Sequence, residues 1–337
     1  MNATRPRRGS ALFAAALLLA LAAVVVAQLS GGGASAAGSP IATKSAKLKL
    51  INDSSLQLSS PNESPRAVAL CPGGLEPYGG GMSATPSPDS AGEGVYPHSY
   101  ERLGAQSGFH TTPVLYDPTP SQTRSYQVTL QVLCTKKFGK VADPHAIQLD
   151  VPSGTSVTLV AKCPKKSVLI GGGFQRAAFE SAGGVYPTES HAISKTKWQA
   201  SGTAFGTIRN DMVSIAYCMA SPKRKPLLTE VSASVAIAPG QVGFVTTPPC
   251  TGGRKMLYNG FDTNPKTGTQ QGMFFADGIF NADQTFTASA YNNSGATATL
   301  TAYGYCMKNS VIGGSLKKFT KKVGRLDENT VVKEDEG

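Results

Sequence analysis

The distribution of apolar and polar residues divides the chain into two parts. After residue 37, apolar positions recur mainly at every second residue, as in SVTLVAKC at 156–163, VSASVAIA at 231–238 and TLTAYGYC at 299–306. A period of two is typical of β-strands with one buried face. A helical period of about 3.6 residues is absent from this part, apart from a turn or two near the C-terminus. The sequence therefore predicts an all-β protein of short strands.

The first 36 residues follow a different pattern. Arginines within the first eight residues precede an unbroken apolar run at 11–27, and small residues at 34–36 offer a cleavage site. This order is typical of a secretory signal peptide at 1–36, so the mature chain is expected to begin near Ala37. The alternative is an uncleaved membrane anchor at 11–27, because 17 apolar residues lie at the lower limit for a spanning helix. The cleavage site favours export, and hence a secreted or extracytoplasmic protein.

The remaining chain contains an internal repeat. Cys71 and Cys163 are both followed by proline, and a triple glycine begins eight residues after each of them. Val-Tyr-Pro follows, and an alternating run then closes each copy at a second cysteine. A third copy begins at Cys250, keeps one glycine and replaces the proline by Thr251. The repeat glycines, which we expect to be structural, are Gly79, Gly80, Gly81, Gly171, Gly172, Gly173 and Gly260.

Each copy is predicted to hold four to six strands. Three tandem pseudo-repeats of this kind fit either a stacked, pseudo-threefold β-prism or three small sandwiches. The predicted segments are a signal peptide at 1–36, a linker and leading strand at 37–66, repeats at 67–135, 145–219 and 226–308, and a disordered charged tail at 309–337.

The six cysteines allow fifteen pairings. Outside the cytosol they are expected to be oxidised. None lies in a C-x-x-C motif and none has a histidine at ligand spacing, so neither a metal nor another cofactor is expected. The repeat selects one pairing, in which a bridge opens and closes each copy: Cys71–Cys134, Cys163–Cys218 and Cys250–Cys306.

The triple glycine is expected to lie in a strand that needs a backbone without Cβ. On this basis Gly172→Val should damage folding more than Asn293→Ala, which changes a polar stretch of the third copy.

Some aromatic residues recur in register. Trp198 and Phe286 each stand 20 residues before the closing cysteine of their copy, and the first copy shows no such residue. Together with Tyr96 and Tyr186 they are either core residues or a platform on which sugar rings stack. Their repeat-equivalent positions favour the core.

Catalytic signatures are missing from the chain. It has no G-x-S-x-G, H-E-x-x-H, phosphate-binding or dinucleotide-binding motif, and no carboxylate is duplicated in register. The four histidines do not recur at equivalent places, and solvated loop histidines are the expected reading: His98, His110, His145 and His191. We therefore expect no enzyme, with a secreted hydrolase as an alternative.

The formal net charge of the chain is +11. Residues 1–36 carry three arginines and no acids, so their removal leaves +8, which is densest at KRK 223–225 and KKFTKK 317–322. A mild basic balance fits contact with anionic cell-envelope polymers or glycans, and it equally fits no partner. The basic residues are not interleaved with aromatic ones, so nucleic-acid binding is not expected.

The cysteine-proline pair, the triple glycine and the closing run into a cysteine resemble a repeat of secreted actinobacterial proteins, some of which carry it behind collagen-like tracts. The resemblance covers roughly residues 67–307 and rests on Cys71, Pro72, residues 79–81, Cys134 and their counterparts in the second copy. It implies no activity and no catalytic residues. Three such units are also similar in architecture to vitelline membrane outer layer proteins, which form a β-prism.

Together these features predict an exported, non-catalytic structural or binding protein of the cell envelope or extracellular space. The alternative is a carbohydrate-binding, lectin-like module, which would need exposed aromatic residues at the same place in each copy. Three equivalent shallow clefts would favour the lectin, whereas one concave pocket with converging polar groups would favour an enzyme.

Overall fold

The computed structural model divides the chain into two compact units, residues 1–43 and 44–337, and every described residue belongs to the second. The predicted signal peptide and most of the predicted linker lie outside the described residues. The described ranges are 54–58, 67–89, 92–103, 108–116, 126–136, 141–175, 183–206, 211–220, 228–265, 272–308 and 317–322.

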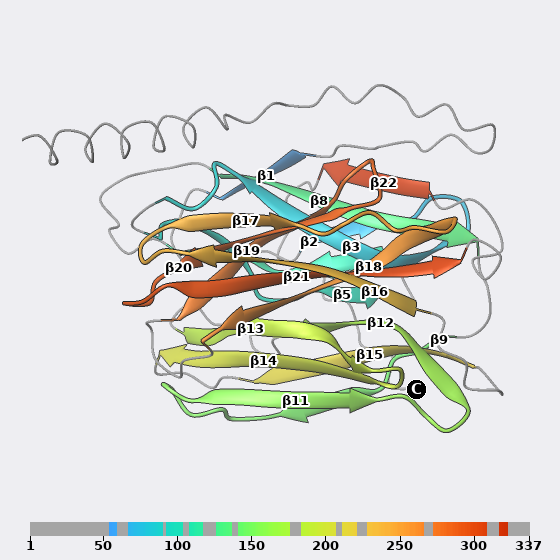
Figure 1. Cartoon of the computed structure of the whole chain (residues 1–337), viewed down its shortest axis with the longest axis horizontal. Helices are drawn as coiled ribbons and strands as arrows, with labels where there is room; N and C mark the ends of the chain where they lie inside the picture. The colour runs from blue at the N-terminus through green and yellow to red at the C-terminus, as the bar shows by residue number, and fades with distance from the viewer. Residues whose placement is uncertain are drawn as a thin grey trace, which may run out of the picture. The chain divides into compact units, whose positions relative to one another are not determined.

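All regular elements in these ranges are β-strands, which confirms the predicted all-β fold (Figure 1). Within the same ranges, no helix is long and apolar enough to cross a membrane.

In each copy the strand after the first cysteine pairs antiparallel with the strand that contains the second. Most residues of these strands are buried, and several of the strands are buried on both faces rather than in alternation. The pairs are β3 (Leu75–Thr85) with β8 (Tyr126–Lys136), β12 (Ser167–Gln175) with β15 (Met212–Ala220), and β18 (Arg254–Asn264) with β21 (Ala298–Lys308).

A second hairpin fills the middle of each copy. In copy 1 it is divided into two short pairs, whereas copies 2 and 3 keep it continuous. The hairpins are β4 (Gly94–Pro97) with β7 (Pro113–Tyr116) and β5 (Glu101–Leu103) with β6 (Gly108–Thr111); β13 (Gly183–Ser194) with β14 (Lys197–Gly206); and β19 (Met273–Phe280) with β20 (Phe286–Asn292).

Leading strands complete the edges. One set pairs with the closing strands: β1 (Ser54–Leu58), β10 (His145–Gln148) with the short β9 (Val141–Ala142), and β16 (Leu228–Ile237). The other set pairs with the second strand of the middle hairpin: β2 (Ala67–Leu70), β11 (Ser156–Lys162) and β17 (Val242–Thr246).

Strands of different copies pair with one another at equivalent positions, and we call this pairing the strand exchange between copies. In every copy the residue 11 places after the first cysteine pairs with a residue of a neighbouring copy's middle hairpin. The three pairs are Met82 with Gly278, Phe174 with Tyr100, and Phe261 with Ser190. Copy 1 thus contacts copy 3, copy 3 contacts copy 2, and copy 2 contacts copy 1.

This exchange decides how the sheets are built. Two large sheets are shared between copies, with the orders β1-β8-β3-β19-β20-β17 and β11-β14-β13-β18-β21-β16. Backbone hydrogen bonds of 2.8 and 3.1 Å between Tyr100 and Phe174 join the β10-β15-β12 sheet to the β2-β6-β5 sheet. The alternative of three separate small sandwiches is therefore wrong, because strands of every copy pair with strands of another copy.

The third glycine of each triplet makes the exchange possible. A Cβ on Gly81, Gly173 or Gly260 would lie 2.3, 2.0 or 2.5 Å from a carbonyl oxygen of the neighbouring copy. Each of these oxygens belongs to the residue that pairs across the junction. Copy 3 keeps a glycine only at this position, which approaches the backbone of another copy in all three repeats. Among the other repeat glycines, Gly79 also approaches backbone of another copy, at Leu257 of copy 3.

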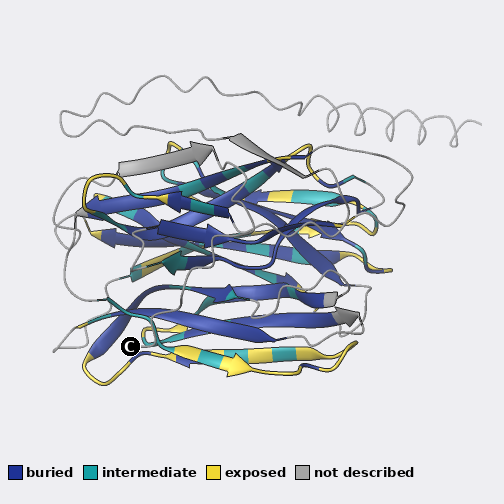
Figure 2. Cartoon of the chain, turned by 180° about the vertical axis from the view of Figure 1, so that it is seen from behind, coloured by how far each residue is buried: buried dark blue, intermediate teal, exposed yellow. Residues whose placement is uncertain are grey.

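Equivalent aromatic residues from all three copies meet in the interior. Tyr96, Tyr186 and Phe274 have ring centroids 5.2–6.3 Å apart. Figure 2 shows the buried central strands in dark blue and the alternately exposed β11 at the margin. The core is therefore shared by the copies.

The prediction of a disordered tail at 309–337 is wrong for residues 317–322, which form a strand. β22 (Lys317–Lys322) pairs with β8 at residues 129–134, beside the stretch of β8 that β1 covers at 126–129. Two short strands thus share the edge of β8, which would otherwise leave backbone N–H and C=O groups unpaired. The rest of 309–337 lies outside the described residues.

Candidate binding site

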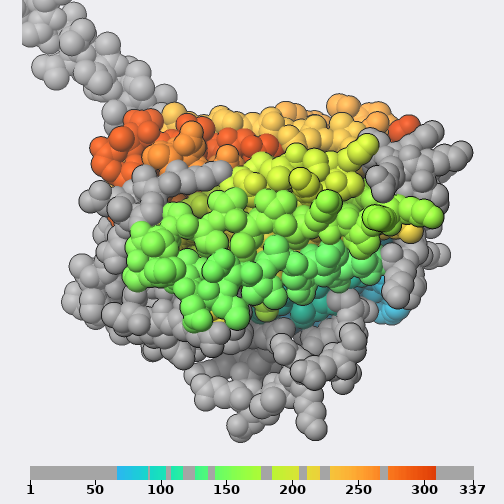
Figure 3. Space-filling view, turned by 90° about the horizontal axis from the view of Figure 1, so that it is seen from below, coloured from blue at the N-terminus to red at the C-terminus, as the bar shows by residue number. Residues whose placement is uncertain are grey.

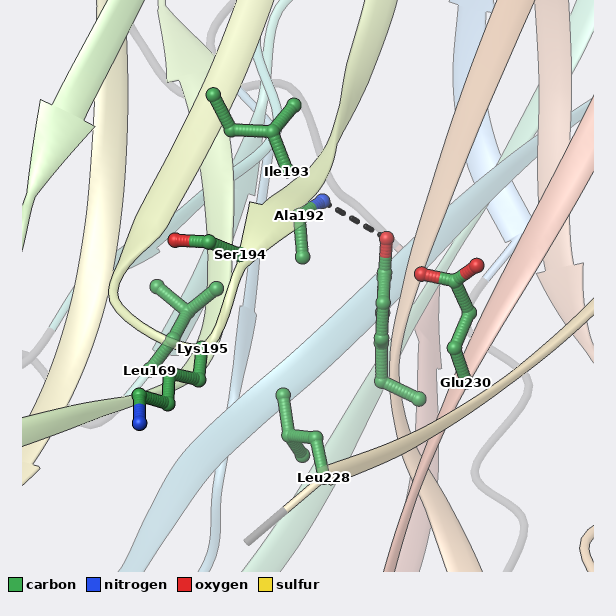
Figure 4. A pocket seen from close by; sticks show the side chains of 8 residues that line it. Leu169, Ala192, Ile193, Ser194, Lys195, Leu228 and Glu230 are labelled. Carbon is green, nitrogen blue, oxygen red and sulfur yellow. Dashed lines mark hydrogen bonds between the residues drawn. The ribbon is translucent and has the colours of Figure 1, made fainter. Parts of the chain in front are cut away.

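A pocket opens where copies 2 and 3 meet. β13 and β18 pair at only two positions, Glu189 with Asp262 and Ser190 with Phe261. Beyond Ser190 that pairing ends, and a cavity of about 440 Å³ lies between the β13–β14 turn and strands β16 and β21 (Figure 4). Its lining residues are Leu169, Ala192, Ile193, Ser194, Lys195, Leu228, Glu230 and Tyr305.

Tyr305 forms the inner wall of the pocket. Its hydroxyl accepts a hydrogen bond of 2.8 Å from the backbone N–H of Ala192, which ties β21 to β13 across the gap (Figure 4). Burial raises the pKa of Tyr305 well above its usual value, and the nearby Glu230 carboxylate raises it further. The ring is therefore a neutral, fixed surface. Burial also raises the pKa of Glu230, while His191 opposes that shift.

A cluster of acid and imidazole groups lies on the same sheet. Glu189 Oε1 is 2.6 Å from His191 Nε2 and accepts a hydrogen bond of 2.7 Å from Gln199, and Ser201 donates to Oε2 at 2.6 Å. Tyr303 stacks on the imidazole, with ring centroids 4.8 Å apart and planes 13° apart. The cluster is held rigidly from several strands.

Lysines gather at the end of copy 2 beside the pocket. Lys162 and Lys197 stand directly opposite each other on β11 and β14. Two backbone hydrogen bonds of 2.9 Å hold the neighbouring chain segments together. The N–H of Cys163 donates to the carbonyl oxygen of Thr196, and the N–H of Leu169 on β12 donates to that of Lys195. We call Lys162, Lys165, Lys166, Lys195 and Lys197 the lysine end; four of them are exposed and Lys197 is half-buried.

Figure 3 shows the face on which copy 2 lies, with its residues in green to yellow-green and residues of copy 3 in orange along one edge. In the described part of the chain, no ion pair joins a lysine of the lysine end to a carboxylate. The charge of this end is therefore not neutralised by described neighbours.

A second histidine network lies in copy 1, and it is buried. His110 Nδ1 is 2.5 Å from Glu101 Oε1 and 3.5 Å from Ser99 Oγ, while Nε2 is 3.3 Å from Thr112 Oγ1. In a serine triad the acid and the hydroxyl occupy different ring nitrogens. Glu101 and Thr112 meet that condition, but His110 is only 1% exposed, Thr112 only 6% and Ser99 not at all. The network is therefore inaccessible to a substrate.

The predicted disulfides are all present. Cys71–Cys134, Cys163–Cys218 and Cys250–Cys306 close, with Cα atoms 5.6–5.7 Å apart. No described cysteine is free. Three disulfides indicate an extracytoplasmic protein.

The predicted glycines lie at close contacts rather than at turns. A Cβ on Gly80 or Gly172 would lie 2.1–2.2 Å from an aromatic ring, of Phe109 or Trp198 respectively. A Cβ on Gly79 would lie 2.1 Å from the carbonyl oxygen of Leu257, and one on Gly171 would lie 2.2 Å from the ring of Tyr258. The geometry agrees with the expectation that these strands require a backbone without Cβ.

The proposed aromatic platform is not an exposed surface. Tyr96, Trp198 and Phe286 are at most 1% exposed, and Tyr186 is half-buried against Tyr96. These rings fill the interior because each lies on the inward face of a middle hairpin.

The expectation that copy 1 has no aromatic residue equivalent to Trp198 is wrong. Phe109 stands opposite Arg102 on the middle hairpin, as Trp198 stands opposite Ala192 in copy 2. Phe109 stands 25 residues before Cys134 rather than 20, so the spacing that identifies Trp198 does not identify it.

One pair of carboxylates does recur in register, contrary to the sequence-based expectation. Glu189 and Asp277 both lie three residues after the equivalent aromatic residues Tyr186 and Phe274, and each accepts a hydrogen bond from a serine of the next strand. They lie in different sheets, so they form no acid/base pair.

Of the other histidines, His98 is buried against the Tyr186 ring with centroids 4.7 Å apart, and His145 is exposed on β10. The expectation of solvated loop histidines is therefore wrong for His98 and His110, since both lie in the interior. No protein-family model matches the chain, and no curated protein matches it.

Proposed function

We propose that the chain is an exported, non-catalytic binding protein whose lysine end binds an anionic polymer of the cell envelope. The observation that carries this proposal is the direct opposition of Lys162 and Lys197. Like charges at directly opposed positions destabilise a sheet. Three further lysines on the adjoining turns add to the repulsion, and a polyanion would relieve it.

Support for a binding role also comes from the architecture. We propose that the three copies form a pseudo-threefold body of the β-prism type, as the resemblance to vitelline membrane outer layer proteins implies. The cyclic strand exchange and the shared aromatic interior fit this arrangement. Such a body presents broad outer sheet faces and strand ends, which suit contact with an extended polymer better than with a small substrate.

The burial of the His110 network supports a non-catalytic role. His110, Thr112 and Ser99 are at most 6% exposed, so their hydroxyl and imidazole groups are inaccessible to a substrate. Burial of Trp198 and Phe286 removes the main support for a lectin with three equivalent sites. Secretion after cleavage near Ala37 remains part of the proposal.

The test uses the purified mature chain and three immobilised probes: polyphosphate, polygalacturonate and neutral dextran. We expect retention on both polyanions and none on dextran. Lys162→Gln/Lys197→Gln should weaken retention. The control is Gln241→Glu/Thr246→Glu, which changes the residue before β17 and the last residue of that strand, in another sheet. It changes the net charge by the same two units and should retain most binding.

Equal loss in the two double variants would show that only net charge matters, and the assignment to the lysine end would fail. Retention on dextran equal to that on the polyanions would contradict the proposal and favour a glycan-binding module. No retention on any probe would also contradict it.

A further inference from the structure

The geometry points to a divalent transition-metal site, for Zn²⁺ or an ion of similar preference, formed by Glu189, His191 and Asp262. Each residue offers one ligand atom, and these atoms lie within 4.8 Å of one another. Glu189 and His191 come from β13 of copy 2, and Asp262 comes from β18 of copy 3. The site therefore exists only because the copies exchange strands. It is independent of the lysine end.

The orientation of the imidazole suits a ligand. His191 Nδ1 lies 3.1 Å from the carbonyl oxygen of Ala192. A carbonyl oxygen only accepts, so Nδ1 is the donor and its proton is accounted for. Metal-bound histidines usually donate their other ring N–H to a carbonyl or carboxylate in this way. Stacking on Tyr303 fixes the ring plane, and Nε2 is left facing the Glu189 carboxylate at 2.6 Å.

The charges at this junction call for a cation. Glu189 and Asp262 stand directly opposite each other on β13 and β18, and Glu189 is only 1% exposed. Two opposed carboxylates repel each other, more strongly where water is excluded. The contact of 2.6 Å between Glu189 Oε1 and His191 Nε2 holds a proton in the metal-free chain, and a divalent ion would displace that proton. The ion would then carry positive charge to both carboxylates and to the imidazole.

The fold does not require these three residues. The same places hold Asp277, Ile279 and Ser83 at the junction of copies 3 and 1, and Ser99, Glu101 and Gln175 at the junction of copies 1 and 2. Strands pair at all three junctions, yet only one of them places two carboxylates with an imidazole. The donor set is thus an addition to the scaffold.

The donor types select the ion. One imidazole nitrogen and two carboxylate oxygens match the preferences of Zn²⁺, whereas Ca²⁺ takes six to eight oxygen ligands. Asp262 and His191 are only half-buried, so one side of the site faces solvent. A three-residue Zn²⁺ site of this kind keeps a position open for water or a ligand atom.

The test is isothermal titration calorimetry of the untagged, metal-free mature chain with ZnCl₂ and, separately, CaCl₂. We expect one Zn²⁺ per chain and no comparable binding of Ca²⁺. His191→Gln and Asp262→Asn should each weaken Zn²⁺ binding by more than about 100-fold, because removal of outer-shell partners alone costs roughly 10–100-fold. Thermal unfolding without metal shows whether each variant is folded, and either folded variant is sufficient for the comparison.

A control variant accompanies them. His145→Gln removes an exposed histidine of β10, away from the proposed ligands. It should keep the affinity for Zn²⁺ within about twofold of the unchanged chain, since it supplies no ligand. The assignment is overturned if the unchanged chain binds no stoichiometric Zn²⁺, or if folded His191→Gln and Asp262→Asn variants bind as it does. It also fails if His145→Gln loses as much affinity as they do.

Discussion

Gly173→Ala perturbs one junction between copies with a single methyl group. In the present structure the new Cβ would lie 2.0 Å from the carbonyl oxygen of Tyr100. Ordinary carbon–oxygen contacts are about 3.3 Å or more. The two backbones must therefore separate by more than about 1 Å, because neither side of this contact is a flexible side chain.

The size of the effect follows from what this separation breaks. The hydrogen bonds between Tyr100 and Phe174, at 2.8 and 3.1 Å, would lengthen beyond a useful distance. Two such bonds contribute about 1–3 kcal/mol in total, and overpacking of an interior typically costs about 1–3 kcal/mol. Both figures partly describe the same displacement. We therefore expect the free energy of unfolding to fall by about 3 kcal/mol, which lowers Tm by roughly 6–12 °C.

Urea and thermal unfolding followed by circular dichroism measure this loss. Gly295→Ala is the matched control, because its Cβ would meet nothing within 4 Å and its φ is not left-handed. That variant should be neutral or slightly stabilised, since alanine restricts the unfolded chain. If Gly173→Ala were as stable as Gly295→Ala, the strand exchange at this junction would be refuted.

Two further predictions follow from buried groups. Burial raises the pKa of the Asp277 carboxyl from 3.8 to about 6. Its contribution to the free energy of unfolding is therefore fully present below about pH 4 and is lost as the pH rises through 6. Asp277→Asn should therefore gain stability over the unchanged chain between pH 4 and 7, up to about 3 kcal/mol, whereas parallel pH profiles in urea unfolding would contradict this. Cys163→Ser/Cys218→Ser opens a bridge that spans 55 residues and should cost about 2–5 kcal/mol, measured by urea unfolding of both proteins under non-reducing conditions; equal midpoints would refute it.

The repeat made much of the fold predictable from the sequence. Duplicated cysteines identify which strands lie together within a copy, because a disulfide requires close Cα atoms. The triple glycine marked a place of close backbone approach. Which backbone approaches Gly173 was not predictable, because the partner, Tyr100, belongs to another copy and is joined only by long-range pairing.

The candidate sites were largely hidden from sequence reasoning for the same reason. Asp262 is far from Glu189 and His191 along the chain, so no ligand spacing identifies the three residues as a set. The lysine end is formed by two turns, and Lys162 and Lys197 face each other only through the register of β11 and β14. That register places Trp198 of β14 on the inward face. The sequence shows this tryptophan, but it does not show which residue of β11 lies opposite Lys197.

Binding of a polyanion by the lysine end should weaken steeply with salt, because binding releases counterions from the polymer. Affinity for soluble polyphosphate is measured from about 50 to 200 mM NaCl, a range over which counterion release dominates. For nucleic acid polyanions each neutralised charge contributes a slope of about 0.7–0.9 in log K against log salt, so five lysines predict a slope near −4. Lys162→Gln/Lys197→Gln should reduce its magnitude by about 1.5, with Gln241→Glu/Thr246→Glu close to the unchanged chain. An unaltered slope in the lysine double variant would contradict the claim.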